Sequence, residues 1–495
     1  MGVVKKQGIA NTLLVYIGTL VGAVSLLLVQ PIYLTKEELG LTRLILSFAT
    51  VLASVLSFGI SSVTVRYLPR VFHAESGHRG FFGFMLLYVS TSVSLGVLLL
   101  LALKDPLAQL YPADAGIFTH NLKYVIVLSV SYSFVLGFNS YCLALLRSVF
   151  PTFLNDIIVR LLFVAVIFLH FFGYLSLDRF LMAFCMIYAL QALVMLIYTY
   201  AVDRPSLVPD FAHFQQEIGL RSILRYGAII TFTAINSVSL KYIDSIFVGS
   251  ISIKDVAIYS VAAFIGLIIE IPLNALERIA NPVIAHAMVT KDMTAIGTIY
   301  QRSARFLFLL GGWMFVIVIL NVRDLLSLLP EGFSLGWPVA MVIAAGALIN
   351  MATGINYPIL VNSDRYIYGS VFLVALLAIT VVGNWLLIPR IGMMGAAITA
   401  CLANAVFNGL KFEFIRRRFG LQPFDGRTAR IALVIVSSIL LVIFIPLFFH
   451  PIANMILRTI LASSLFLFAV MRFGLMADLY EYLPAFLRQR IGDRS

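Results

Sequence analysis

The sequence predicts an all-α membrane protein with about fourteen transmembrane helices. Of its 495 residues, 61% are hydrophobic and 12% are charged, whereas soluble domains are about 45–50% apolar and about 25% charged. The apolar residues form runs of helix length, and a hydrocarbon core about 30 Å thick needs roughly 20 helical residues to cross it. A transmembrane β-barrel would show shorter segments of alternating polarity. We therefore expect one membrane domain without a separately folded soluble part.

Fourteen apolar runs follow one another along the chain and are expected to be the membrane-spanning helices. They cover residues 9–32, 41–65, 81–103, 122–146, 152–173, 179–201, 226–250, 256–286, 304–321, 336–361, 367–388, 393–414, 429–449 and 452–471. The first run lacks a small-residue cleavage pattern, so we expect it to be retained. Cys142, Cys185 and Cys401 lie inside runs, where a thiol behaves as a small hydrophobe. Neither a disulfide framework nor a metal cluster is expected.

The formal net charge of +12 indicates membrane topology, because the Lys and Arg residues lie in short loops between the apolar runs. When these loops are assigned alternately to the two sides, one side holds roughly three times as many basic residues as the other. The richer side is expected to be the cytoplasm. An even number of spans then places both termini there, and nucleic-acid binding is not expected.

The two longest cytoplasmic links divide the runs into blocks of six, six and two. The predicted organisation is an N-lobe at 1–201, a link at 202–225, a C-lobe at 226–415, two further helices at 416–474 and an amphipathic cytoplasmic tail at 475–495. KEELGLTRLILSF from Lys36 and KDVAIYSVAAF from Lys254 stand at the start of the second helix of each block. This weak match suggests an internal duplication, which is a recurrent transporter plan. Chance similarity between apolar helices is the alternative.

Three segments resemble those of bacterial polysaccharide flippases. They are YIDSIFVGSISIKDVAIYSVAAF from Tyr242, IPRIGMMGAAITA from Ile388 and LGLTRLILSFATVLASVLSFGISSVTVRYLPR from Leu39. The chain thus resembles the Wzx-type lipid-linked oligosaccharide flippases, in the superfamily that also holds multidrug extruders and the lipid II flippase. The resemblance implies two pseudo-symmetric six-helix lobes around a central cavity, with two extra C-terminal helices. It also implies a bacterial cytoplasmic (inner) membrane and, as substrate, undecaprenyl pyrophosphate carrying a sugar repeat unit.

The clearest membrane-embedded charges are predicted in the seventh and eighth runs. A charge in mid-bilayer costs roughly 2.5–3.5 kcal/mol on insertion scales, so retained charges usually face protein or water. Lys241 and Asp244 are three residues apart and share a helix face. Either they neutralise each other, or Lys241 attracts the pyrophosphate while Asp244 holds the lysine in position or binds a coupling ion.

The eighth run carries two carboxylates beside a proline. Glu270 and Glu277 are seven residues apart and roughly on one face, with Pro272 and Asn274 between them and Arg278 adjacent. A proline bends a helix, and carboxylates with freed carbonyls are hard oxygen ligands for a proton or Na⁺. We therefore predict Glu270 and Glu277 as ion-coupling residues and Arg278 as a substrate-binding residue. The alternative is a plain kink near the cytoplasmic surface.

In the fifth run, Asp156 and Arg160 are four residues apart. Arg160 either snorkels or pairs with Asp156, or it faces the cavity, where its planar fork suits phosphate oxygens. Asp156 is the remaining candidate for ion coupling. Further candidate substrate-binding residues, each with an anchoring or helix-bonding alternative, are Arg66, Lys123, Asn236 and Asn350.

Other function classes fit the sequence less well. The chain has no GxxxxGK[ST] motif for ATP binding. A membrane glycan polymerase or acyltransferase would need a sizeable catalytic loop, whereas the longest outer loop is the short KDPLAQLYPADAGIFTHN from Lys104. A multidrug or cation antiporter would need a negative cavity, and the predicted deep charges are mixed. We expect a flippase that works by alternating access, without a cofactor, and whose partners are the lipid-linked oligosaccharide, membrane lipids, Na⁺ or H⁺, and glycan polymerase or ligase proteins.

Overall fold

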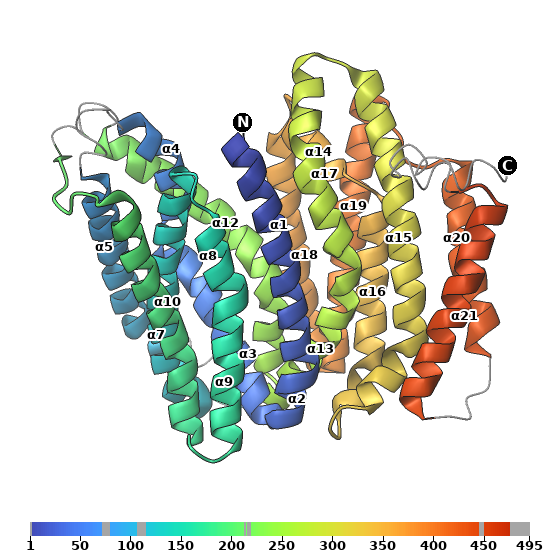
Figure 1. Cartoon of the computed structure of the whole chain (residues 1–495), viewed down its shortest axis with the longest axis horizontal. Coiled ribbons are helices and arrows are strands. Elements are labelled where there is room, and N and C mark those ends of the chain that lie inside the picture. Colours follow the sequence, from blue (N-terminus) through green and yellow to red (C-terminus); the bar gives the residue numbers. More distant parts are fainter. Residues whose placement is uncertain are drawn as a thin grey trace. The chain divides into compact units, whose positions relative to one another are not determined.

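The fold is helical throughout the part of the chain that the computed structural model describes, residues 2–71, 80–105, 115–211, 214, 219–444 and 450–475. In this part, 14 helical segments are long and apolar enough to cross a membrane, and each overlaps one predicted run. The predicted fold class is therefore confirmed (Figure 1).

The chain divides into two compact units, Met1–Ala257 and Ile258–Ser495. The predicted lobes, with their division at residues 202–225, stay a prediction. The predicted amphipathic tail lies outside the described residues from position 476 onward.

The first unit consists of long spanning helices with two short π-helical segments among them. Its elements are α1 (Gly2–Val24), η1 (Ser25–Val29), α2 (Gln30–Tyr33), α3 (Lys36–Leu56), α4 (Ile60–Val71), α5 (Phe81–Ala102), α7 (Ala115–Ala144), α8 (Val149–Phe153), η2 (Leu154–Ile158), α9 (Val159–Phe171), α10 (Leu177–Asp203), α12 (Leu220–Gly249) and the first turn of α13 (Ile253–Leu267). Helix α7 packs against α3, α4, α5 and α10, and α12 packs against α3 and α4. Aromatic residues such as Phe82 and Tyr141 fill the core between them.

Helix α3 begins five residues before the predicted run because its first turn has a complete capping box. The Thr35 side chain accepts a hydrogen bond from the Glu38 backbone, and the Glu38 side chain accepts one from the Thr35 backbone. Such a box satisfies N–H groups that would otherwise lack partners at a helix start. As a result, Arg43 lies about 10 Å along the helix instead of in its first turn.

Both π-helical segments follow from local backbone bonding. In η1, the Gln30 backbone N–H donates to the carbonyl of Ser25, five residues earlier. Pro31, the next residue, has no N–H and cannot continue the ordinary ladder. In η2, the Val159 N–H donates to the carbonyl of Leu154 in the same way. Such π-bulges occur frequently at functional sites.

The second unit contains the rest of α13 and the remaining spanning helices. These are η3 (Ile268–Glu270), α14 (Ile271–Val289), α15 (Met293–Ser327), η4 (Phe333–Gly336), α16 (Trp337–Ala352), α17 (Asn356–Val361), α18 (Ile367–Ile391), α19 (Met393–Phe419), α20 (Gly426–Ile443) and α21 (Pro451–Arg472). Helix α15 packs against α16, α20 and α21, and α19 packs against α16 and α18. Helix α15 starts well before its predicted run, 304–321, because Asp292 caps it. The Asp292 side chain accepts a 2.9 Å hydrogen bond from the Ala295 N–H.

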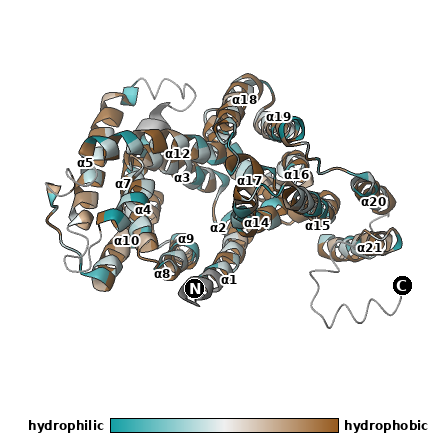
Figure 2. Cartoon of the chain, turned by 90° about the horizontal axis from the view of Figure 1, so that it is seen from above, coloured by the Kyte–Doolittle hydropathy of each residue, from teal (hydrophilic) through white to brown (hydrophobic). Residues whose placement is uncertain are grey.

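Hydrophobic residues, brown in Figure 2, predominate along the helices, and many large ones are exposed. Leu98, Trp385 and Phe444 are each more than half exposed. In water such a surface would drive aggregation, whereas lipid tails are as apolar as leucine and solvate it.

Candidate functional site

The first unit holds a group of polar side chains deep within its spans. We call it the arginine cluster, and it comprises Ser25, Gln30, Arg43, Thr50, Tyr132, Asn155, Asp156, Arg160, Tyr188, Gln191 and Tyr242. Arg43 donates a hydrogen bond from Nη2 to Gln30 Oε1. The Gln30 amide in turn donates to Ser25 Oγ over 2.9 Å. The π-helical segment η1 and its successor α2 therefore hold the Arg43 guanidinium in place.

Arg160 stands at the middle of the span Val149–Phe171. Its Nη1 donates to the backbone carbonyl of Gly18 on α1. A Cβ atom at Gly22 would overlap the same guanidinium, and one at Gly18 would lie 2.6 Å from Asp156 Cβ. Two glycines one helical turn apart thus give α1 the groove that receives Asp156 and Arg160. Small residues have this role at many helix contacts in membranes.

An amide and carboxylate chain surrounds the second π-helical segment. Asn155 Nδ2 donates to Asp156 Oδ1 over 3.0 Å, and Gln191 Nε2 on α10 donates to Asn155 Oδ1 over 3.2 Å. This chain fixes the Asp156 carboxylate one turn from Arg160, as the sequence spacing predicts.

Three tyrosines bring hydroxyl groups to the same region. Tyr132 and Tyr188 pack edge to face with ring centroids 6.1 Å apart. Tyr242 of α12 hydrogen-bonds Thr50 of α3. Arg43 lies near enough to Tyr188 and Tyr242 to interact electrostatically with both.

The two guanidinium groups repel each other, and neither forms an ion pair with a carboxylate among the described residues. Arg43 and Arg160 both keep part of their surface exposed although they lie deep in the unit. Guanidinium groups bind phosphate oxygens through paired N–H donors. With neighbouring hydroxyl and amide groups, the arginine cluster can therefore bind an anion such as a diphosphate.

The second unit holds a different group, which we call the lysine–carboxylate cluster: Glu270, Glu277, Asn350, Tyr357 and Lys411. Glu270 ends the short 3-10 turn η3 at the middle of the span Ile253–Val289. Asn350 Nδ2 of α16 donates to Glu270 Oε1 over 3.1 Å. Glu277 lies two turns further on α14 and interacts electrostatically with Glu270.

Lys411 is 3% exposed and belongs to α19. Its Nζ stands 4.1 Å from the centroid of Phe407 and 5.9 Å from that of Tyr357. It interacts electrostatically with Glu277 and Glu270, yet it forms no ion pair within 4 Å in the described part of the chain. Lys411 is thus a buried basic residue that interacts with two acidic residues of the same unit.

The other residues predicted for the site differ in their exposure. Lys241 is exposed on α12 and Asp244 is half-buried. Asn236 is buried and donates to the Phe232 carbonyl over 2.7 Å. Arg278 is exposed.

Arg66 and Lys123 contact aromatic or acidic neighbours. The Arg66 guanidinium lies 4.3 Å from the Tyr226 centroid. Lys123 Nζ is 2.9 Å from Asp178 Oδ1, and both side chains are well exposed. Their roles in substrate binding stay predictions.

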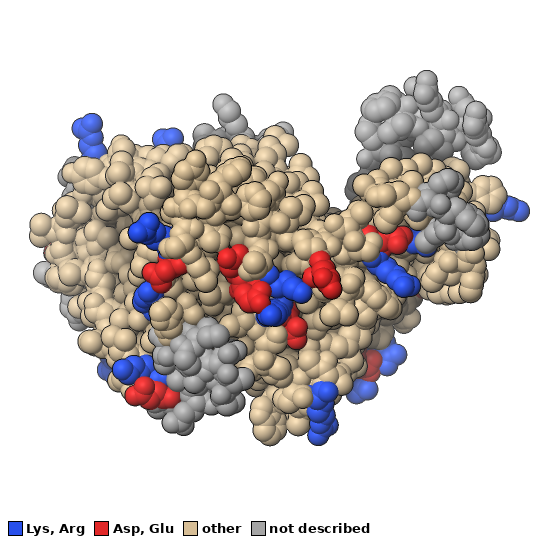
Figure 3. Space-filling view, turned by 90° about the horizontal axis from the view of Figure 1, so that it is seen from below, with Lys and Arg blue, Asp and Glu red and all other residues tan. Residues whose placement is uncertain are grey.

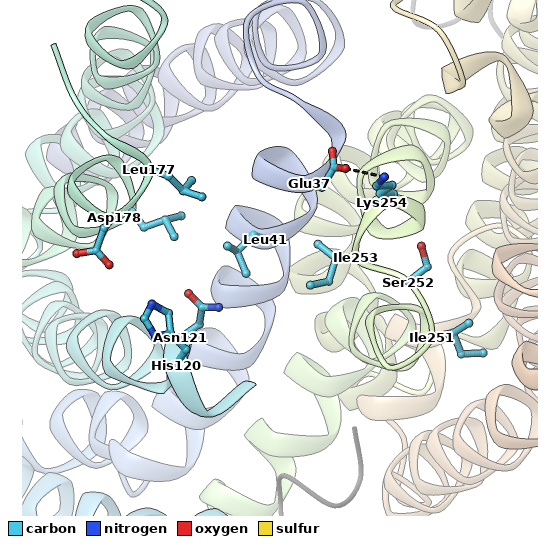
Figure 4. A pocket seen from close by; sticks show the side chains of 11 residues that line it. Glu37, Leu41, His120, Asn121, Leu177, Asp178, Ile251, Ser252, Ile253 and Lys254 are labelled. Carbon is cyan, nitrogen blue, oxygen red and sulfur yellow. Dashed lines mark ion pairs between the residues drawn. The ribbon is translucent and has the colours of Figure 1, made fainter. Parts of the chain in front are cut away.

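A cavity of about 640 Å³ lies in the first unit near the starts of α3, α7 and α10. Figure 4 shows the ion pair that joins Glu37 of α3 to Lys254, with Nζ and Oε1 2.7 Å apart. Leu41, Leu177 and Ile253 give the cavity an apolar lining. The ion pair links α3 to the first turn of α13.

Lys and Arg side chains, blue, and Asp and Glu side chains, red, are visible on the face seen in Figure 3. Among the residues searched, no group of three or more His, Cys, Asp or Glu side chains forms a metal site.

The described part of the chain, with 14 helices long and apolar enough to cross a membrane and charged side chains within them, is that of a multi-pass membrane protein. A model of the family described as polysaccharide biosynthesis protein matches residues 4–288, more than half of the chain. The chain belongs to this family.

Solved structures agree on the fold. The chain is similar to the lipid II flippase MurJ in an inward closed conformation, with a TM-score of 0.73, 12% identity and coverage of 95% of this chain and 99% of that chain. It is also similar to an inward-facing multidrug resistance MATE family transporter of the MOP superfamily, with a TM-score of 0.63, 15% identity and coverage of 81% and 94%. An uncharacterised membrane protein of Methanocaldococcus jannaschii is 23% identical over 492 residues, which cover 90% of each protein.

The sequence analysis missed Arg43 and Lys411, which it assigned to loop charges. Thr35 and Glu38 already have the spacing of a capping box, which would have placed Arg43 beyond the first turn of its helix. Gly420 after three arginines is a typical helix end, and this would have placed Lys411 more than two turns inside α19.

Proposed function

We propose that this protein is a flippase that moves undecaprenyl-pyrophosphate-linked oligosaccharide units from the inner to the outer leaflet of a bacterial cytoplasmic membrane. Both termini would lie in the cytoplasm, and glycan polymerase or ligase proteins would use the product. In this proposal the arginine cluster binds the pyrophosphate, and Lys241, Asn236 and Asn350 contribute to the path of the head group.

One observation carries the proposal: Arg43 and Arg160 lie inside the spans without a carboxylate partner in the described part of the chain. Buried charges are expensive and mark substrate pathways in membrane proteins. A diphosphate would offset both positive charges at once. Membership of the polysaccharide biosynthesis family makes a glycan carrier the natural anion.

A multidrug or cation antiporter would need the opposite charge at this place. The two guanidinium groups repel an organic cation, and Asp156 alone does not reverse the sign of the site. The cation-extruder alternative is therefore less well supported by the arginine cluster.

The proposed cycle is alternating access. The head group, drawn by the arginines, enters a cavity open to the cytoplasm while the polyprenyl tail stays in lipid. A Na⁺ or H⁺ gradient drives the return of the flippase to the state open to the cytoplasm. A charge crossing the membrane field gains about 2.3 kcal/mol per 100 mV. A bound ion shifts the two states only by its difference in affinity for them.

The proposal is tested by flipping assays in proteoliposomes loaded with the lipid-linked oligosaccharide. We expect R43A and R160A to reduce flipping by roughly 10-fold to 100-fold, since each removes hydrogen bonds to a charged group worth about 1.5–3 kcal/mol. R43K and R160K keep the charge but lose the paired donors, and they should fall between alanine and wild type.

The matched control is R390A, which removes an exposed arginine of α18. It should flip at the wild-type rate. Full flipping by both R43A and R160A, with normal expression and monodisperse elution, would exclude the arginine cluster as the pyrophosphate site. Efflux of cationic dyes by the wild type, without any flipping, would favour the antiporter.

A further inference from the structure

We propose that Lys411 is a built-in cation of the lysine–carboxylate cluster, and that this cluster exchanges a single proton and excludes Na⁺. The binding site stands on its own geometry. Its use for coupling rests on the proposed flippase function.

The location of the cluster supports a tethered cation. Glu270 is at the middle of its span, and Lys411 is 3% exposed on a helix that packs against α16. The lysine interacts electrostatically with both carboxylates, while its ammonium group has no ion pair within 4 Å among the described residues. An ammonium group has three donors and no acceptor. It therefore supplies a fixed positive charge near both carboxyl groups.

The charges of the cluster favour one exchangeable proton. Two carboxylates and one ammonium group leave one unit of negative charge, and a charged group within the bilayer is expensive. One proton on Glu270 or Glu277 makes the cluster neutral. A bound Na⁺ would also neutralise it, but Na⁺ would have to collect oxygen ligands beside a fixed ammonium group that repels it.

The groups around the carboxylates agree with this assignment. Asn350 Nδ2 of α16 donates to Glu270 Oε1 and so fixes the position of this carboxyl group. Tyr357 of α17 interacts electrostatically with Glu277, and α15 contributes Tyr300 to the same core. On α19 the neighbours are Lys411 itself and the Phe407 ring.

Na⁺ binding can be tested on the purified full-length protein without any flipping assay. The apparent Tm of the wild type should be the same in NaCl and in choline chloride at equal ionic strength. K411Q leaves two carboxylates without their cation and should gain a Na⁺-dependent rise in Tm of about 2 °C or more. E270Q/K411Q should lose that rise, and K411R, which keeps the charge, should behave as the wild type.

The proton is tested by infrared titration of the carboxyl C=O stretching band, which also serves if K411Q fails to fold. The wild type should show a protonated carboxyl band that disappears as the pH rises. In E270Q the one remaining carboxylate is balanced by Lys411, so this band should be missing from the variant and should therefore appear in the wild-type minus E270Q difference spectrum.

Each outcome decides the proposal independently of flipping. A Na⁺-dependent rise in the Tm of the wild type, no Na⁺ response in folded K411Q, or identical infrared titrations of the wild type and E270Q would each overturn the proton site. If the site survives these tests while proteoliposomes show no flipping, the proposed flippase function fails and the proton site stands.

Discussion

Arg43 and Lys411 are accommodated inside the spans in different ways. Arg43 hydrogen-bonds the Gln30 amide, and a hydrogen bond to a charged group is worth about 1.5–3 kcal/mol. Lys411 lies over the Phe407 ring, and a desolvated cation–π contact is worth about 2 kcal/mol. Burial costs several kcal/mol per ion, so neither contact is sufficient alone. At Lys411 two carboxylates offset the remaining cost of burial, whereas at Arg43 a bound anion would offset it.

Gly22 gives a residue-level test of the arginine cluster. In G22A the new methyl group would displace the Arg160 guanidinium, which is the flexible end of a long side chain. We expect flipping to fall while the apparent Tm changes little, because the side chain can move without shifting the helices. Proteoliposome flipping and thermal unfolding of the same preparation measure the two effects.

Gly18 and Gly409 are the matched controls. In G18A the methyl group would meet Asp156 Cβ at 2.6 Å and its backbone carbonyl at 2.8 Å, so α1 and η2 would have to separate and the Tm should fall. At Gly409 no atom lies within 4 Å, and G409A should leave both properties unchanged. If G22A flips at the wild-type rate, flipping does not depend on the position of the Arg160 guanidinium in the groove of α1.

At the scale of elements, helix boundaries decided which charges the sequence could predict. Arg160 was predicted as a membrane-embedded charge because it lies about two helical turns inside its run, 152–173. Arg43 and Lys411 fall near the ends of their predicted runs, 41–65 and 393–414, and so resemble loop charges. The helices extend to Lys36 and Phe419, which moves both residues deep into the spans.

The arrangement of the clusters depends on contacts that no single run contains. Asn350 and Glu270 are far apart in the sequence, and their hydrogen bond follows from the packing of α16 against η3. Hydrophobic periodicity predicts each helix but does not specify which helices are neighbours. The pairing of Arg160 with the Gly18 carbonyl was unpredictable for the same reason.

The contact between α3 and the α12–α13 turn gives a test at the element scale. A methyl group at Gly40 would overlap the Ile253 carbonyl, a backbone atom that cannot rotate away. We expect G40A to lower the free energy of unfolding by about 1–3 kcal/mol, as overpacking does. Chemical or thermal unfolding of the purified protein measures it.

The nearby ion pair should matter far less. The Glu37 and Lys254 side chains are 55% and 59% exposed, and exposed pairs contribute about 0–1 kcal/mol. E37A and K254A should therefore change the stability less than G40A does. The reverse order would mean that the ion pair, and not the close backbone contact, fixes the turn against α3.

At the scale of the whole molecule, composition and run length were sufficient for the number and order of the spans. Each of the 14 spans overlaps its predicted run, because a helix in lipid must satisfy its own backbone hydrogen bonds and must be about 20 residues long. The exposed apolar surface is the direct consequence. The identities of the substrate and of the coupling ion depend on a few polar side chains, so they do not follow from these constraints.

The orientation of the whole chain in the membrane is a separate prediction, carried by the basic residues of the loops. Positive loops stay in the cytoplasm, so the α9–α10 turn should face outward and the α14–α15 turn inward. Tyr174 and Thr290, both exposed, mark these turns. In a variant without Cys142, Cys185 and Cys401, a membrane-impermeant maleimide should label Y174C in intact cells and T290C only after permeabilisation. The inverse labelling would show that the chain has the opposite orientation. The flippase would then present its arginine cluster to the substrate from the wrong leaflet.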